Sequence, residues 1–167
     1  MKINKKPVYF FISLFIAVFI LKQISKNYTI NISPSLPRGI YRLEPAETIE
    51  IGDIVYFDIP PEVENLLRER EYTYIFVKAF IKKVAAKEGD TISIINKNLY
   101  VNEENWGILF DADPQNRKIS QLTIEELTPQ DGEILPLTEV EYSFDGRYFG
   151  PIKISDIKYK CKLVFEF

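Results

Sequence analysis

The chain has 167 residues, a length that fits one domain of ordinary size or one domain behind an anchor. Its composition, 46% apolar and 27% charged, is that of a folded protein. It contains no His and a single Cys, which excludes a Ser-His-Asp triad, a Cys-His dyad, zinc sites built from His or Cys, and an internal disulfide. Chemistry must therefore use hydroxyls, carboxylates, amines or the backbone, and we expect neither a metal nor a cofactor.

Charge is divided unevenly along the chain. Residues 1–30 carry five lysines and no acid, which leaves 16 basic against 24 acidic side chains in residues 31–167. Binding to a phosphate backbone needs clustered cations, so this acidic body argues against nucleic acid as a partner.

The N-terminal segment is basic and then strongly apolar. Val8–Leu21 contains only two side chains with polar atoms, and a helix over residues 7–24 would be roughly 27 Å long. No small-x-small cleavage site follows, as a signal peptide would require, and a buried core helix would more often carry a polar stripe. We interpret 7–24 as an uncleaved transmembrane anchor. The excess of lysines before it predicts that 1–6 is a cytoplasmic tail and that the body lies outside the cytoplasm.

The rest of the chain is predicted to be a mostly β domain, 31–167, joined to the anchor by a linker, 25–30. Prolines and polar residues interrupt short runs of β-branched and aromatic residues. Pro61–Arg70 has the composition of a helix, and a long excursion is expected at about 103–138, polar from Asp111 to Gly132. The runs that predict strands are Ile40–Leu43, Asp53–Asp58, Tyr72–Ala86, Thr91–Ile95, Leu99–Val101 and Leu163–Phe167.

One hairpin is predicted from its turn residues. Asn96-Lys97-Asn98 separates Thr91–Ile95 from Leu99–Val101. Asn tolerates the positive φ that tight hairpin turns require, so we expect Asn at those positions.

A stiff segment near the anchor holds one serine. Asn31–Tyr41 reads NISPSLPRGIY, in which Pro34 and Pro37 favour extended conformations and Gly39 permits a turn. Ser35 therefore has little freedom. A nucleophile needs such constraint, because a misplacement of about 1 Å can reduce the rate about 100-fold. The alternative interpretation is a Pro-rich linker between anchor and domain.

A serine nucleophile needs a base, and without His the candidate is a lysine whose pKa is lowered by burial. From a reference pKa of about 10.4, the lowering must be several units. Lys82 and Lys83 lie in one apolar run, Phe76–Ala86, and strand alternation places them on opposite faces. Alternation does not choose between them. The alternative is a half-exposed strand whose lysines point at solvent.

Tyr142–Ile152 (YSFDGRYFGPI) contains an acid and a base two residues apart. Asp145 and Arg147 could form an exposed ion pair at a turn, which would contribute only about 0–1 kcal/mol. The alternative is a buried pair that supports an active site.

Four motifs follow the apolar segment in order. They are Asn31-x-Ser33-x-Ser35-x-Pro37-x-Gly39-x-Tyr41, Ile51-Gly52-Asp53-Ile54-Val55, Ile81-Lys82-Lys83-Val84-Ala85-Ala86 with Gly89-Asp90, and Ser143-x-Asp145-x-Arg147-Tyr148-Phe149-Gly150-Pro151. In this order they resemble the signal peptidase I family of Ser-Lys endopeptidases, in its branch of conjugative-transfer TraF-type peptidases. The resemblance implies a signal-peptidase-like β domain behind a single N-terminal transmembrane helix.

The resemblance also implies roles for individual residues. Ser35 matches the nucleophile and Lys82, rather than Lys83, the general base, so we expect Ser35 Oγ and Lys82 Nζ within hydrogen-bond reach. Ser33 matches a hydroxyl that joins the Ser35 N–H in an oxyanion site. Ser143 matches the residue that hydrogen-bonds the lysine. Asp145 and Arg147 match a supporting pair, and the chain departs from the family pattern at Lys83 in place of Arg, Glu88 in place of Pro and Gly146 in place of Ser.

The function implied is a serine endopeptidase of the inner cell membrane that removes leader peptides from secreted or conjugative-pilus precursors through an acyl-enzyme. Its partners would be a precursor bound as an extended strand and the lipid bilayer around the anchor. The alternative is a catalytically silent anchored β domain that assists pilus or secretion assembly. That alternative would be favoured if Lys82 were exposed or far from Ser35. A self-cleaving regulator with the same dyad would usually carry a DNA-binding module, which the anchor replaces here.

Overall fold

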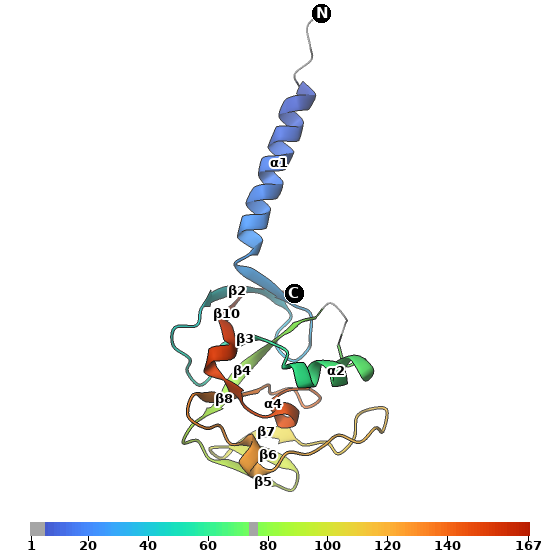
Figure 1. The fold of residues 1–167 in the computed structure, drawn as a ribbon, viewed down its shortest axis with the longest axis vertical. Coiled ribbons are helices and arrows are strands. Elements are labelled where there is room, and N and C mark those ends of the chain that lie inside the picture. The colour runs from blue at the N-terminus through green and yellow to red at the C-terminus, as the bar shows by residue number, and fades with distance from the viewer. Residues whose placement is uncertain (1–5, 74–76) are drawn as a thin grey trace, which may run out of the picture.

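The computed structural model describes residues 6–73 and 77–167, with side chains from Tyr9 onward (Figure 1). The predicted tail, 1–6, therefore lies outside the described residues except for Lys6. Four α-helices, a 3₁₀ helix and ten strands are described. The helices are α1 (Lys6–Ser25), α2 (Pro61–Glu69), α3 (Ile124–Leu127) and α4 (Gly146–Phe149), with the 3₁₀ helix η1 at Ile154–Asp156.

The strands form two antiparallel sheets. The first has the order β1-β2-β10-β3-β4-β8-β9 and the second the order β5-β6-β7. Figure 1 shows the larger sheet next to α1 and the smaller one at the far end of the body. The strands are β1 (Tyr28–Asn31), β2 (Gly39–Pro45), β3 (Ile54–Asp58), β4 (Ala79–Lys87), β5 (Ile92–Ile95), β6 (Asn98–Val101), β7 (Glu104–Ile108), β8 (Glu133–Leu137), β9 (Ile152–Lys153) and β10 (Ile157–Glu166).

Helix α1 projects from the body, and C-terminal strand β10 ends near its base (Figure 1). Its apolar side chains from Tyr9 to Ile24 are exposed. The segment contains no Gly, and its one Pro lies in the first turn, where a missing N–H is tolerated. Within the described part of the chain, no helix combines the length and the apolar character needed to cross a membrane. The transmembrane assignment of 7–24 therefore stays a prediction.

The second half of the predicted linker, 25–30, lies in strand β1. Strand β1 pairs with β2, from Tyr28 opposite Arg42 to Asn31 opposite Gly39. A four-residue edge strand is stabilised by the ladder bonds of its partner rather than by its own sequence pattern, which is why it was missed. The same hairpin shows that the serine segment is the loop between two paired strands, not a flexible linker.

Three other expectations change in detail. The predicted strand Tyr72–Ala86 begins only at Ala79, because the Tyr72 N–H donates to the Leu67 carbonyl at 2.9 Å at the end of α2, and residues 74–76 lie outside the described residues. The predicted excursion, 103–138, contains β7 and β8 at its two ends. In the hairpin turn the residues with positive φ are Asn96 and Lys97, whereas Asn98 begins β6.

The core explains how a strand lysine becomes buried. Strands β4 and β8 are buried on both faces: Ala85 and Leu135 pack in the cluster under the small sheet, and Val84 and Ile134 pack in the cluster beside β3. Lys82 lies two residues before Val84 on the same face of β4 and is buried with it, whereas Lys83, on the other face, is only half-buried.

Candidate active site

Ser35 lies on the loop between β1 and β2 and is 8% exposed. Its backbone N–H donates to Ser33 Oγ at 3.2 Å, and the two Oγ atoms are 2.8 Å apart. The side chain of Ser33 is itself exposed. The loop thus brings together the two serines that the sequence singled out, with one hydroxyl close to both the N–H and the Oγ of the other.

Lys82 is buried and its neighbour is not. Lys82 is 4% exposed and pairs across the sheet with the fully buried Val55, whereas the side chain of Lys83 is 33% exposed and donates to Glu139 at 2.8 Å. The choice that alternation left open is therefore decided by packing. The interpretation in which both lysines point at solvent is wrong.

Among residues 6–73 and 77–167, the Lys82 ammonium has one hydrogen-bond partner and lies near one aromatic ring. Nζ donates to Ser143 Oγ at 2.8 Å and lies 5.3 Å from the centre of the Phe80 ring. Burial lowers the pKa of Lys82 from 10.5 to about 8. The Asp145 carboxylate opposes that lowering and the Arg147 guanidinium adds to it. A useful fraction of this amine is therefore neutral near pH 8.

Asp145 and Arg147 form a buried ion pair, both 0% exposed. Arg147 donates to Asp145 through Nε at 2.9 Å and through Nη2 at 2.7 Å. Thr138 donates to the same carboxylate from its N–H and its hydroxyl, both at 3.1 Å. The exposed-pair interpretation is wrong. The sequence also missed Thr138, which follows an apolar strand without any local signal.

The remaining donors of Arg147 bond to backbone carbonyls. Nη1 donates to Trp106 at 3.2 Å and Nη2 donates to Val140 at 2.9 Å. Gly107 permits this approach, because a Cβ there would lie 2.9 Å from Nη1 and its φ is +101°. The guanidinium therefore joins small-sheet strand β7 to the segment that carries the lysine's partner.

Close packing explains why Gly146 stands where the family pattern has Ser. A Cβ at this position would lie 2.7 Å from the carbonyl oxygen of Pro136 and 2.9 Å from a methyl group of Leu135. Helix α4 packs too closely on β8 for any side chain, so the serine that is usual here in the family would not fit.

The predicted hydrogen bond between Ser35 and Lys82 is absent from the described part of the chain. Ser35 Oγ is bonded to Ser33 and Lys82 Nζ to Ser143. The catalytic roles of both residues stay predictions. No group of three or more His, Cys, Asp or Glu side chains gathers as a metal site in residues 6–73 and 77–167.

Comparison with known proteins agrees with this arrangement of motifs. The family model described as "Signal peptidase, peptidase S26" matches residues 4–166. A plasmid transfer protein TraF of Escherichia coli is 33% identical over 138 residues, which cover 77% of each chain. Thylakoidal processing peptidase 1 of Arabidopsis thaliana is 30% identical over 65% of this chain, a match that spans 30% of that longer protein. A solved signal peptidase I of Enterococcus faecalis superposes on 68% of this chain and 97% of its own with a TM-score of 0.39 and 18% identity.

A mostly β fold and the ordered serine, lysine and Asp-Arg motifs define a peptidase class. The chain belongs to the signal peptidase family, peptidase S26. Within that family it groups with the TraF-type branch.

Proposed function

We propose that this protein is a membrane-anchored serine endopeptidase that removes leader peptides with a dyad of Ser35 and Lys82. The observation that carries the proposal is the buried Lys82, whose pKa is lowered to about 8 and whose Nζ is oriented by Ser143. Signal peptidase family membership supports leader-peptide removal as the reaction.

The chemistry follows from the two hydroxyls and the amine. Neutral Lys82 would take the proton of Ser35 Oγ as that oxygen attacks the scissile carbonyl. For this, Ser35 Oγ must turn from Ser33 toward Lys82. That rotation also frees the Ser33 hydroxyl to join the Ser35 N–H as an oxyanion donor, and removal of one such donor typically reduces the rate by about 10²–10³-fold. Lys82 would then protonate the leaving amine, and water would release the acyl-enzyme.

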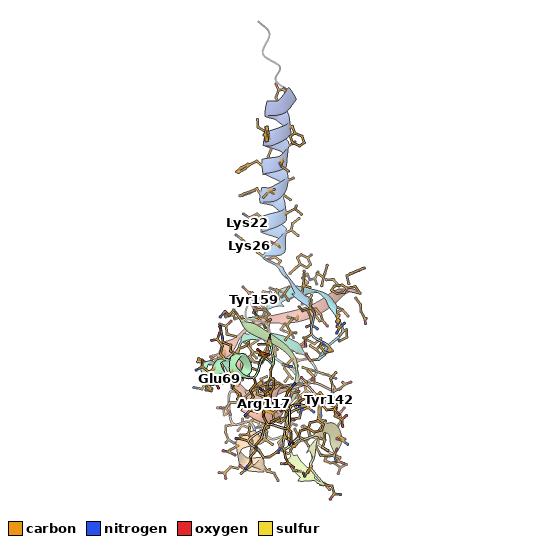
Figure 2. All side chains as sticks on the ribbon, turned by 90° about the vertical axis from the view of Figure 1, so that its right-hand side faces the viewer. Lys22, Lys26, Glu69, Arg117, Tyr142 and Tyr159 are labelled. Carbon is orange, nitrogen blue, oxygen red and sulfur yellow. The ribbon has the colours of Figure 1, made fainter. Side chains whose placement is uncertain are left out.

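The proposal includes a single-pass anchor in the inner membrane, with the peptidase domain on the extracytoplasmic side. Support comes from the exposed apolar side chains of α1 and from the lysines around it. Lys22 and Lys26 lie where α1 joins the body, as Figure 2 shows. Cations at the two ends of an apolar helix can reach the lipid headgroups.

We further propose that the substrate is the precursor of a secreted or pilus protein, bound as an extended strand. Strand β1 is an edge of the larger sheet and leads directly into the Ser35 loop. An edge strand offers unpaired backbone groups to an incoming peptide. The similarity to TraF proteins supports a role in conjugation.

The second candidate is a catalytically silent anchored domain that assists pilus or secretion assembly. The lack of a Ser35–Lys82 hydrogen bond in the described residues favours it. The burial and lowered pKa of Lys82 oppose it, because a lysine without a catalytic role gains nothing from desolvation.

The test is cleavage of a leader-peptide reporter in detergent by the wild type and three variants. We expect Ser35→Ala and Lys82→Ala to lose activity by about 10⁴-fold or more, whereas the matched control Lys83→Ala stays active. The wild-type rate should rise with pH around a midpoint near 8, since only the neutral amine can accept a proton. Activity that survives in Ser35→Ala would end the proposal, and a wild type that cleaves no precursor would favour the silent domain.

A further inference from the structure

One side chain is bonded to the backbone on both sides of Ser35. Asn31 is the last residue of β1 and is 7% exposed. Its Nδ2 donates to the carbonyls of Ser33 at 3.0 Å, Leu36 at 3.0 Å and Pro37 at 3.2 Å. Its Oδ1 accepts from the N–H of Ser33 at 3.1 Å. A single amide group thus makes four contacts within the loop.

The loop needs such a partner because its own backbone donors are few. Pro34 and Pro37 have no N–H, and the ladder between β1 and β2 ends where Asn31 faces Gly39. Asn31 Nδ2 supplies a donor to three of the carbonyls beyond that point. A carboxamide is the one neutral side-chain group that offers two N–H donors and an acceptor oxygen at once.

A second buried side chain donates a hydrogen bond to the C-terminal part of the same loop. The hydroxyl of Tyr41, a residue that is 0% exposed, donates to the carbonyl of Pro37 at 2.8 Å. Pro37 therefore accepts from both Asn31 and Tyr41, so the C-terminal half of the loop is tied to the sheet from two directions. Ser35 lies between this point and the Ser33 contacts of the same amide.

We propose that Asn31 is the positioning residue of the nucleophile. Its side-chain amide holds the backbone around Ser35, so that the Ser35 N–H stays in place for oxyanion binding while the Oγ turns toward Lys82 for attack. Asn31 has no hydrogen bond to Ser35 itself, so its effect is indirect. The inference rests on the proposed peptidase function, and its test therefore includes a measurement that needs no cleavage.

The central variant is Asn31→Asp, which keeps the shape of the side chain but replaces the donor with a charged oxygen facing three carbonyls. The matched control is Asn27→Asp, the same change at an exposed position four residues earlier. We expect the kcat of Asn31→Asp to fall about 100-fold with KM within twofold of the wild type, because a displacement near 1 Å has that effect on rate. The midpoint of the pH-rate limb should stay unchanged, since Lys82 is untouched.

Hydrogen exchange of the segment 32–38 provides the measurement that does not depend on activity. Asn31→Asp should exchange at least tenfold faster there than the wild type, and Asn27→Asp should match the wild type. Asn31→Ser, which removes the same bonds without adding a charge, serves if Asn31→Asp does not fold, as judged by its thermal melting.

Faster exchange together with a lower kcat supports the positioning role. Unchanged exchange, a kcat within twofold of the wild type, or a loss confined to KM overturns it. A wild type that cleaves no precursor would favour the silent domain over the peptidase, and that result is separate from the exchange result.

Discussion

The two halves of the site are stabilised by different kinds of interaction. Around Ser35 the contacts are neutral: an amide, hydroxyls and backbone carbonyls. Around Lys82 they involve buried ions, with Asp145 and Arg147 both 0% exposed. Neutral hydrogen bonds contribute about 1 kcal/mol each, whereas a buried ion that loses its partner destabilises by several kcal/mol.

This difference matches the two tasks of the proposed serine–lysine pair. A nucleophile has to be placed, and neutral bonds can do this at any pH. A base needs a pKa near the working pH, and that pKa depends on burial and on nearby charges. In the structure burial lowers the pKa of Lys82, while Asp145 and Arg147 act on it in opposite directions. The comparison predicts that changes near Lys82 alter the free energy of unfolding or the pH dependence strongly, and that changes near Ser35 alter the free energy of unfolding less and without dependence on pH.

The largest effect is expected for Arg147→Ala. The change leaves the Asp145 carboxylate buried without its cation, so we expect the free energy of unfolding to fall by about 3–5 kcal/mol. Denaturant unfolding measures this. The control is Arg42→Ala, whose exposed pair with Glu44 should contribute less than about 1 kcal/mol. Equal losses in both variants would contradict the special role of the buried pair.

The next effect is a gain in stability for Lys82→Met that depends on pH. The folded pKa of Lys82 is about 8 against 10.5 as the ordinary value, so between these pH values the unfolded chain binds more protons and stability rises with pH. Below pH 8 the burial of the charged amine is fully unfavourable, by roughly 3 kcal/mol. Lys82→Met should therefore be more stable than the wild type at pH 7, by up to that amount.

The difference in unfolding free energy between Lys82→Met and the wild type should disappear as pH rises from 8 to 10.5. The control is Lys83→Met, the same change at the half-exposed neighbour. Unfolding free energies measured at pH 7, 9 and 10.5 provide the test, and a gap for Lys82→Met that stays constant over that range would show that the amine is not desolvated.

A smaller effect is expected for Ser143→Ala. The charged amine of Lys82 loses its hydroxyl acceptor and the neutral amine loses less, so the pKa should fall further and the limb of the pH-rate profile should move to lower pH. We expect kcat/KM to fall about tenfold, in line with one hydrogen bond to a charged group. Ser120→Ala, at an exposed position, is the control. An unmoved limb would mean that Ser143 does not influence the base.

The smallest effect is expected for Tyr41→Phe at the serine end. It removes one neutral hydrogen bond to Pro37 and should reduce stability by about 1 kcal/mol. Burial raises the pKa of Tyr41 above its ordinary 10, so the hydroxyl keeps its proton and the loss should be the same from pH 5 to pH 9. A loss of stability that varied with pH over this range would contradict the distinction between the surroundings of Ser35 and those of Lys82.

Local features of the sequence were sufficient to predict much of the fold. The apolar runs predicted β2, β3, β5 and β6, and the composition of Pro61–Arg70 predicted α2. Pro34 and Pro37 identified the constrained serine, because their ring geometry acts without help from the rest of the chain. The family resemblance, carried by four ordered motifs, is also a property of sequence alone and agrees with the family match.

Features that depend on distant partners were not predictable in this way. Strand β1 exists because β2 pairs with it, and the Tyr72 hydroxyl donates to Asp113, a residue 41 positions away. The amide of Asn31 gave no signal beyond its place in a motif, since its importance lies in which carbonyls surround it.

By itself, then, the sequence determined which catalytic groups are excluded, the stiff serine segment and a choice of two lysines from which the family resemblance takes Lys82. These follow from side-chain type, backbone restriction, periodicity and the order of the motifs. Only the tertiary structure decided that Lys82 is the buried amine, that Asp145 and Arg147 form a buried pair, and that Asn31 and Tyr41 hold the serine loop. Burial and hydrogen-bond partners are properties of the packed chain, because desolvation and pairing arise only when strands far apart in sequence are brought together.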